Sequence, residues 1–153
     1  MHLAELNIAK PKYALDDPRI ADFVDNLDRI NAVAENMPGY VWRYTDESGN
    51  AIDTVGPWGA DVIVNTSVWE TPEHFENFVW NTVHKRFYNR KNEWFDAMDS
   101  HYFVMWWVEE GHQPSFEEAK QRLDHMDKNG DSDFAFGWSH LPHVKLWQTQ
   151  QCG

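Results

Sequence analysis

The chain has 153 residues, a formal net charge of −12 and one cysteine, Cys152. This length suits one domain, the acidity argues against nucleic acid or an anionic membrane as a partner, and a lone cysteine forms no internal disulfide. The longest apolar run, residues 102–108, is far shorter than the roughly 20 residues of a membrane helix. No signal peptide is visible, so we expect a cytoplasmic protein.

The first half of the chain predicts three strands and one helix. Residues 2–8 alternate loosely between two faces, which indicates a strand. Asp17 before Pro18 is an N-cap followed by a proline at the first helical position, and apolar residues at helical spacing extend this helix to Ala34. Two further strands are predicted at 40–44 and 61–69, and the turn-forming residues 46–60 separate them.

The second half predicts two helices around one strand. Thr71 and Pro72 repeat the cap signal and open a helix that we expect to run to about Met98. Residues 102–108 are apolar on both faces, which is typical of a strand in a covered sheet. Ser115, followed by Glu118 as a capping box, predicts a helix to about Met126. A turn at 127–133 and an irregular tail at 134–147 follow.

The predicted order is β-α-β-β-α-β with a C-terminal extension, which is the ferredoxin-like split pattern of an α+β protein. We expect a single domain over 1–153, with a core at 1–111 and a C-terminal helix and tail at 112–153. The helices would cover one face of an antiparallel sheet. A second copy of the chain would bury the other face, which makes a homodimer the expected assembly.

Polar residues interrupt two of the predicted strands on what should be the face without helices. Glu5 and Asn7 share a face of the first strand, and Asn65 and Ser67 share a face of the third. A buried polar group without a partner costs roughly 1–3 kcal/mol. Either these residues line a cavity that holds water or ligand, or this face of the sheet is exposed.

The long predicted helix carries two candidate functional residues. Arg90 falls inside the apolar stripe, where an arginine forms an ion pair, clamps a ligand or extends its charged end to solvent. His84 lies beside Trp80, and histidine is the side chain best suited to move a proton near neutral pH. The alternative for His84 is a partly exposed histidine on a helix surface.

No metal site is predicted. The acidic segment 127–133 lacks the glycine and glutamate that a calcium loop needs at its sixth and twelfth positions. His140 and His143 have no third ligand at an obvious spacing. The nine tryptophans instead indicate an aromatic ligand site or a large dimer core, and the sequence leaves both open.

Several segments resemble a bacterial family of uncharacterised proteins, the domain of unknown function 3291. They are HLAELNIAK, PGYVWR, SVWET, the H-x5-R-x3-WF run and YFVMWWVEEGHQPSFEEAKQRL. That family is similar to the dimeric α+β barrel superfamily, which includes antibiotic-biosynthesis and haem-degrading monooxygenases. The resemblance implies a homodimer whose sheets close into a barrel, with a pocket between sheet and helices in each subunit.

The resemblance also implies site residues. Haem-degrading members use an Asn on the first strand and a Trp and a His on the long helix, which correspond here to Asn7 and His84, with Phe78 at the position of the Trp and Trp80 two residues away. Members that need no cofactor use Asn, Trp, Tyr and Arg on an aromatic ketone or phenol. The matching residue types here are Asn7 or Asn65, Trp80 or Trp107, Tyr102 and Arg90.

We therefore expect a small-molecule enzyme that acts on a hydrophobic aromatic substrate, by oxygenation without a cofactor or by proton transfer. His84 would be the general acid or base, and Asn7 and Arg90 would hold a substrate oxygen. The predicted walls of the pocket are Phe78, Trp80, Tyr102, Trp106, Trp107 and Asn65. The alternatives are a ligand-binding dimer without catalysis, and a haem-binding or haem-degrading protein with His84 as the axial ligand.

Overall fold

A computed structural model describes residues 1–46, 54–98, 101–142 and 144. The first strand lies at the centre of its β-sheet. Strand β1 (His2–Pro11) pairs with β3 (Ile63–Trp69) along one edge and with β5 (Phe103–Val108) along the other. Strand β2 (Tyr40–Arg43) extends the sheet beyond β3, and the short β4 (Phe95–Asp96) pairs with the end of β1. All pairs are antiparallel, and the order β2-β3-β1-β5 is that of the predicted ferredoxin-like split.

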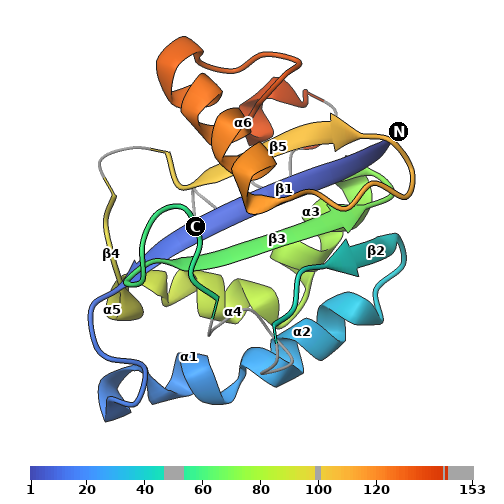
Figure 1. Ribbon diagram of the computed structural model, residues 1–153. Coiled ribbons are helices and arrows are strands. Elements are labelled where there is room, and N and C mark those ends of the chain that lie inside the picture. Colours follow the sequence, from blue (N-terminus) through green and yellow to red (C-terminus); the bar gives the residue numbers. More distant parts are fainter. Residues whose placement is uncertain (47–53, 99–100, 143, 145–153) are drawn as a thin grey trace.

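Helices cover both faces of this sheet (Figure 1). One face carries a set of short elements and the other carries α6 (Phe116–Asn129). The short elements are η1 (Pro18–Ile20), α1 (Ala21–Asp25), α2 (Leu27–Glu35), α3 (Pro72–Asn81), α4 (His84–Asn89) and α5 (Lys91–Trp94). In the described parts of the chain, no helix combines the length and the apolar character that crossing a bilayer requires.

The predicted N-caps are confirmed. The side chains of Asp17, Thr71 and Ser115 accept hydrogen bonds from the backbone N–H groups of Arg19, His74 and Glu118. Each bond satisfies one of the donors that a helix start leaves without a partner. Helix α6 takes up the first residues of the predicted turn at 127–133 and ends at Asn129, and the next residue, Gly130, adopts a positive φ of 76°.

The sheet face that we assigned to a second subunit is covered by α6 of the same chain. Ala4, Leu6 and Trp106 on this face are 0% exposed, and they pack in one cluster with Leu123 and Met126 of α6. Burial of this face therefore needs no partner, which removes the packing argument for dimerisation. The homodimer stays a prediction that other observations must support.

The predicted helix 72–98 is broken twice. Thr82 adopts an extended backbone, and its hydroxyl both donates to the Phe78 carbonyl (2.6 Å) and accepts from the His84 N–H (3.2 Å). This side chain closes α3 and opens α4, since threonine competes with the helix for backbone groups. A second break at Arg90 separates α4 from α5.

The tail after α6 returns to the sheet. Phe136 exchanges two backbone hydrogen bonds with Met105 of β5 (2.8 and 3.0 Å), so one residue of the tail pairs with the strand. A short turn, η2 (Trp138–His140), then lies over the face opposite α6. The part of the predicted tail from 145 onward lies outside the described residues, as do His143 and Cys152.

Candidate functional site

A cavity of about 1140 Å³ lies between the sheet and the helices α1–α5. Its floor is the face of β1 and β3 that carries Glu5, Asn7, Asn65 and Ser67. Aromatic side chains form part of its walls, among them Phe75, Phe78, Trp80 and Tyr88. The volume lies slightly above the roughly 300–1,000 Å³ typical of small-molecule pockets.

The polar strand residues therefore lie on the face covered by α1–α5, and our assignment of them to the face without these helices is wrong. Leu3 of β1 shares a cluster with residues of α2 and α3, whereas Ala4, Leu6 and Ile8 share one with residues of α6. The alternation itself is as predicted. What the sequence did not show is which face each set of helices would cover.

Glu5 is the central polar group of the floor. It lies opposite Ser67 in the register of β1 and β3, is only 2% exposed, and lines the cavity. Burial raises the pKa of Glu5 from 4.5 to about 7, against the hydrogen bonds from Ser67 and Asn7, which lower it. The carboxyl group is therefore close to half ionised at neutral pH, which suits a group that accepts and releases protons.

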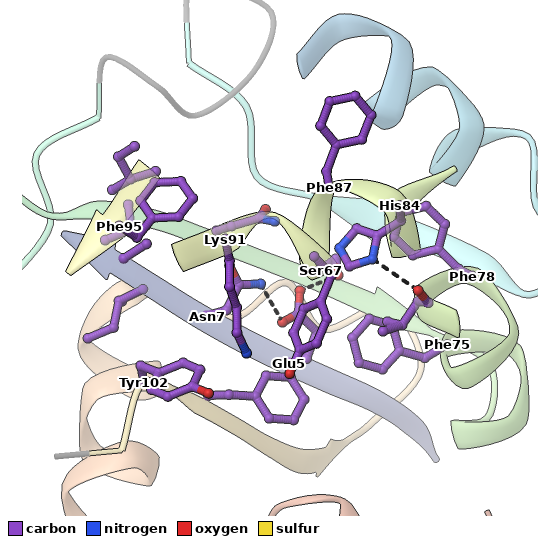
Figure 2. A pocket seen from close by; sticks show the side chains of 18 of the residues that line it. Glu5, Asn7, Ser67, Phe75, Phe78, His84, Phe87, Lys91, Phe95 and Tyr102 are labelled. Carbon is purple, nitrogen blue, oxygen red and sulfur yellow. Dashed lines mark hydrogen bonds between the residues drawn. The ribbon is translucent and has the colours of Figure 1, made fainter. Parts of the chain in front are cut away.

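Ser67 and Asn7 hold the Glu5 carboxyl group in place (Figure 2). Ser67 Oγ donates to Oε1 at 2.7 Å, and Asn7 Nδ2 donates to Oε2 at 3.1 Å. Trp69 Nε1 in turn donates to Ser67 Oγ at 3.0 Å, which fixes the direction of the serine hydroxyl. The carboxyl group consequently has one preferred orientation at the centre of the sheet.

His84 lies at the start of α4 and lines the same cavity. Its Nδ1 is 3.1 Å from the Val79 carbonyl, which only accepts, so Nδ1 carries a hydrogen. Burial lowers the pKa of His84, although this hydrogen bond opposes the shift. At neutral pH the ring is therefore uncharged, and Nε2 is left as an acceptor.

Lys91, at the start of α5, places a cation in the cavity wall. Its Nζ lies 3.9 Å from the centre of the Tyr88 ring and 5.8 Å from that of Tyr102. Burial alone would lower the pKa of Lys91, but Tyr88 and Tyr102 outweigh it and raise the pKa above its ordinary value. Within the described ranges, no carboxylate forms an ion pair with this ammonium group.

Aromatic rings form most of the wall between these polar groups. Phe78 stacks on Trp69 at 5.3 Å and contacts the His84 ring at 4.9 Å. Trp80 meets Tyr88 edge to face at 4.9 Å. The indole Nε1 of Trp80 is buried without a hydrogen-bond partner among the described residues, so Trp80 offers the cavity ring surface only.

The C-terminal tail contributes the last part of the wall. Trp138 stacks on Phe75 at 5.3 Å and on Phe103 at 5.7 Å, and it lines the cavity together with Ser139. These contacts follow from the pairing of Phe136 with Met105, which brings the tail across β5. The sequence had placed Trp138 only in an irregular tail at 134–147.

Six predicted site residues line this one cavity: Asn7, Asn65, Phe78, Trp80, His84 and Tyr102. Arg90 does not. It donates to Glu93 (2.9 Å) and to Asp22 of α1 (3.1 Å), and these hydrogen bonds raise its pKa. Its guanidinium lies 4.7 Å from the centre of the Trp94 ring. The break in the helix places Arg90 on the surface, where it joins α1 to α5.

Trp106 and Trp107 are not part of the cavity wall either. Trp106 points to the α6 face, where its Nε1 donates to Glu118 Oε2 at 2.8 Å. Trp107 is on the cavity face of β5 but at the far end, opposite Leu3, and it packs against Phe136 at 5.7 Å. Adjacent strand residues point to opposite faces, so this pair could not line one pocket together.

Glu5 and Lys91 were not among the predicted site residues. For Glu5 a signal was present, because an acidic residue between Ala4 and Leu6 lies across from Ser67 once strands 2–8 and 61–69 pair. For Lys91 the signal was its helical spacing from His84 and Tyr88, which places the three residues in one row. Among the described residues, no group of three metal-binding side chains gathers anywhere.

Comparison with known proteins gives a family match. Over residues 2–152 the chain matches the family described as a domain of unknown function, DUF3291. It is also similar to a crystal structure from Chloroflexus aurantiacus J-10-fl, described as a candidate antibiotic biosynthesis monooxygenase. That likeness has 20% sequence identity and a TM-score of 0.44, and it covers 74% of this chain and 98% of the other. A comparison with curated proteins finds no match.

Proposed function

The chain belongs to the DUF3291 family, and from its cavity we propose that it is an enzyme that moves a proton on a hydrophobic small molecule. Glu5 is the group that takes up the proton. The observation that carries this proposal is a nearly inaccessible carboxyl group, with its pKa raised by burial to about 7, on the floor of a large aromatic cavity. Proton abstraction from a carbon acid needs a base of this kind, held away from water.

Each neighbour of Glu5 has a part in this reaction. Ser67 and Asn7 orient the carboxylate, and the aromatic walls exclude water and hold a flat substrate. His84 is uncharged and offers Nε2 as a second acceptor. Oxygenation of the deprotonated substrate by O₂, as the monooxygenase prediction requires, is a further step that oxygen uptake during turnover would detect.

A chromogenic carbon acid tests the role of Glu5 without knowledge of the natural substrate. In 5-nitrobenzisoxazole, a base takes the proton on C3 while the N–O bond breaks, and 2-cyano-4-nitrophenolate is released. We expect the wild-type protein to accelerate this reaction above buffer, with a rate that rises with pH through about 7 as Glu5 ionises. Glu5→Gln should lower the rate by about 100-fold or more.

The matched control is Glu117→Gln, which removes an exposed carboxylate from α6 and should leave the rate unchanged. Equal rates for wild type and Glu5→Gln would overturn the proposal. Acceleration that persists in Glu5→Gln but is lost in His84→Ala would move the role of the base to His84, as the sequence first suggested.

Haem binding is a second candidate, and the protonation state of His84 favours it. The neutral imidazole with a hydrogen on Nδ1 leaves Nε2 as the atom that could ligate iron. The aromatic cavity would hold the ring system, and Lys91 is a cation for one propionate. Titration with haemin should then give a Soret shift that His84→Ala abolishes, and an unshifted spectrum would exclude this candidate.

A further inference from the structure

We propose that the cavity selects aromatic carboxylates, and that Lys91 is the residue that binds their anionic group. This inference deepens the proposed function and rests on it for the claim that the bound molecule is a substrate. It concerns a part of the cavity that the proton-transfer role of Glu5 does not use. The carboxylate would lie at Lys91, and the ring system would lie along the aromatic walls.

The surroundings of Lys91 favour an anionic ligand. Its ammonium group is partly buried, lies against the Tyr88 and Tyr102 rings, and has no acidic partner among the described residues. The other lysine or arginine in the lining of this cavity is Arg43, and it pairs with Glu35 at 2.7 Å. A half-buried ammonium group that already lacks part of its hydration gains more from a carboxylate than an exposed one does.

Lys91 lies on the same side of the cavity as Asn7, which donates to the Glu5 carboxyl group. The Tyr102 carbonyl accepts a hydrogen bond from the Ile8 N–H at 2.9 Å, which places Tyr102 beside Asn7 at the end of the floor. Figure 2 shows Lys91 reaching from α5 toward Asn7 and Tyr102, on the side of the cavity where Glu5 accepts from Asn7. A flat molecule bound at Lys91 would therefore lie over the Glu5 carboxyl group.

Selectivity for an anion would be a local property of this site. The whole chain carries a net charge of −12, so its average field disfavours anions. At physiological salt this repulsion is screened beyond about 8 Å, whereas a contact pair inside the cavity is screened much less. A preference for carboxylates over neutral analogues would consequently report on Lys91 and not on the overall charge.

The test compares two ligands of the same shape. Calorimetric titration at pH 6, where Glu5 is mostly protonated, would measure binding of 2-naphthoate and of neutral 2-naphthamide to the full chain. We expect naphthoate to bind about tenfold more tightly. Lys91→Met should remove that preference by weakening naphthoate alone, while Lys91→Arg should keep it. Lys85→Met removes the same charge from α4 outside the cavity and should change neither affinity.

Two outcomes would overturn the inference: equal affinity of the wild-type protein for the two ligands, including no binding of either, or an unchanged preference in Lys91→Met. The wild-type comparison stands even if Lys91→Met fails to fold. The outcomes also separate this inference from the proposed function. If the wild-type protein binds both ligands equally but its rate still depends on Glu5, the proposed function holds and aromatic carboxylates are not its substrate class. Selective binding without any Glu5-dependent rate would indicate a binding protein.

Discussion

We expect the free energy of unfolding of the wild-type protein to fall between about pH 4.5 and pH 7. Replacing Glu5 with glutamine should abolish this fall. In the folded protein the pKa of Glu5 is raised from 4.5 to about 7, so the native state holds this proton more tightly than the unfolded chain does. The stability that this proton supplies is complete below pH 4.5 and is lost as the pH rises through 7. A difference of this size corresponds to roughly 3 kcal/mol.

The measurement is urea unfolding at several pH values from 5 to 8, followed by tryptophan fluorescence. Glutamine keeps the shape of the protonated acid and can still accept from Ser67, and Asn7 can turn its amide to accept from the new N–H₂ group. We expect Glu5→Gln to become progressively more stable than wild type toward pH 8. Glu117→Gln should follow the wild-type curve, and parallel curves for Glu5→Gln would contradict the raised pKa.

Trp106→Ala is expected to lower the free energy of unfolding by about 3–5 kcal/mol. The ring is completely buried between the sheet and α6, and its removal also leaves Glu118 without the indole N–H donor. Because this ring faces away from the cavity, the affinity of the folded variant for 2-naphthoate should stay the same.

Trp106→Phe provides the matched control, since it keeps most of the ring and loses the N–H donor, and it should cost clearly less than the alanine variant. The decisive comparison combines stability with binding. A Trp106→Ala protein that is folded but binds naphthoate poorly would show that this residue shapes the cavity after all. A small loss of stability would mean that α6 packs loosely on the sheet.

The strands and caps were predictable because they depend on neighbouring residues. Alternation at 2–8 and 61–69 located β1 and β3, and the Thr71-Pro72 pair marked the start of α3 within one residue. The antiparallel order β2-β3-β1-β5 followed from the succession of elements. These local signals also put Asn7 and Asn65 on the same face of the sheet, and the register of the structure makes them direct partners.

The remaining features depend on contacts between distant segments. Thr82 is compatible with a helix interior, and its hydrogen bond to the Phe78 carbonyl ends α3 only in the folded context. The breaks at Thr82 and at Arg90 turn the following residues away from the directions that one continuous helix would give, which is why Arg90 was misplaced. In the same way, the last third of the chain must fold back before α6 can cover one face of the sheet and before Trp138 can reach the cavity wall.

The central place of β1 sets the order in which the protein can fold as it is synthesised. This strand is synthesised well before its neighbours in the sheet, since Ser67 lies 62 positions beyond Glu5 and β5 lies further still. Pairings of such long range slow folding and leave the apolar residues of β1 without cover while the chain grows. We expect Glu5 to stay a hydrated carboxylate until these neighbours have been made and have packed over it. The chemistry that we assign to the cavity is thus acquired in the last steps of folding.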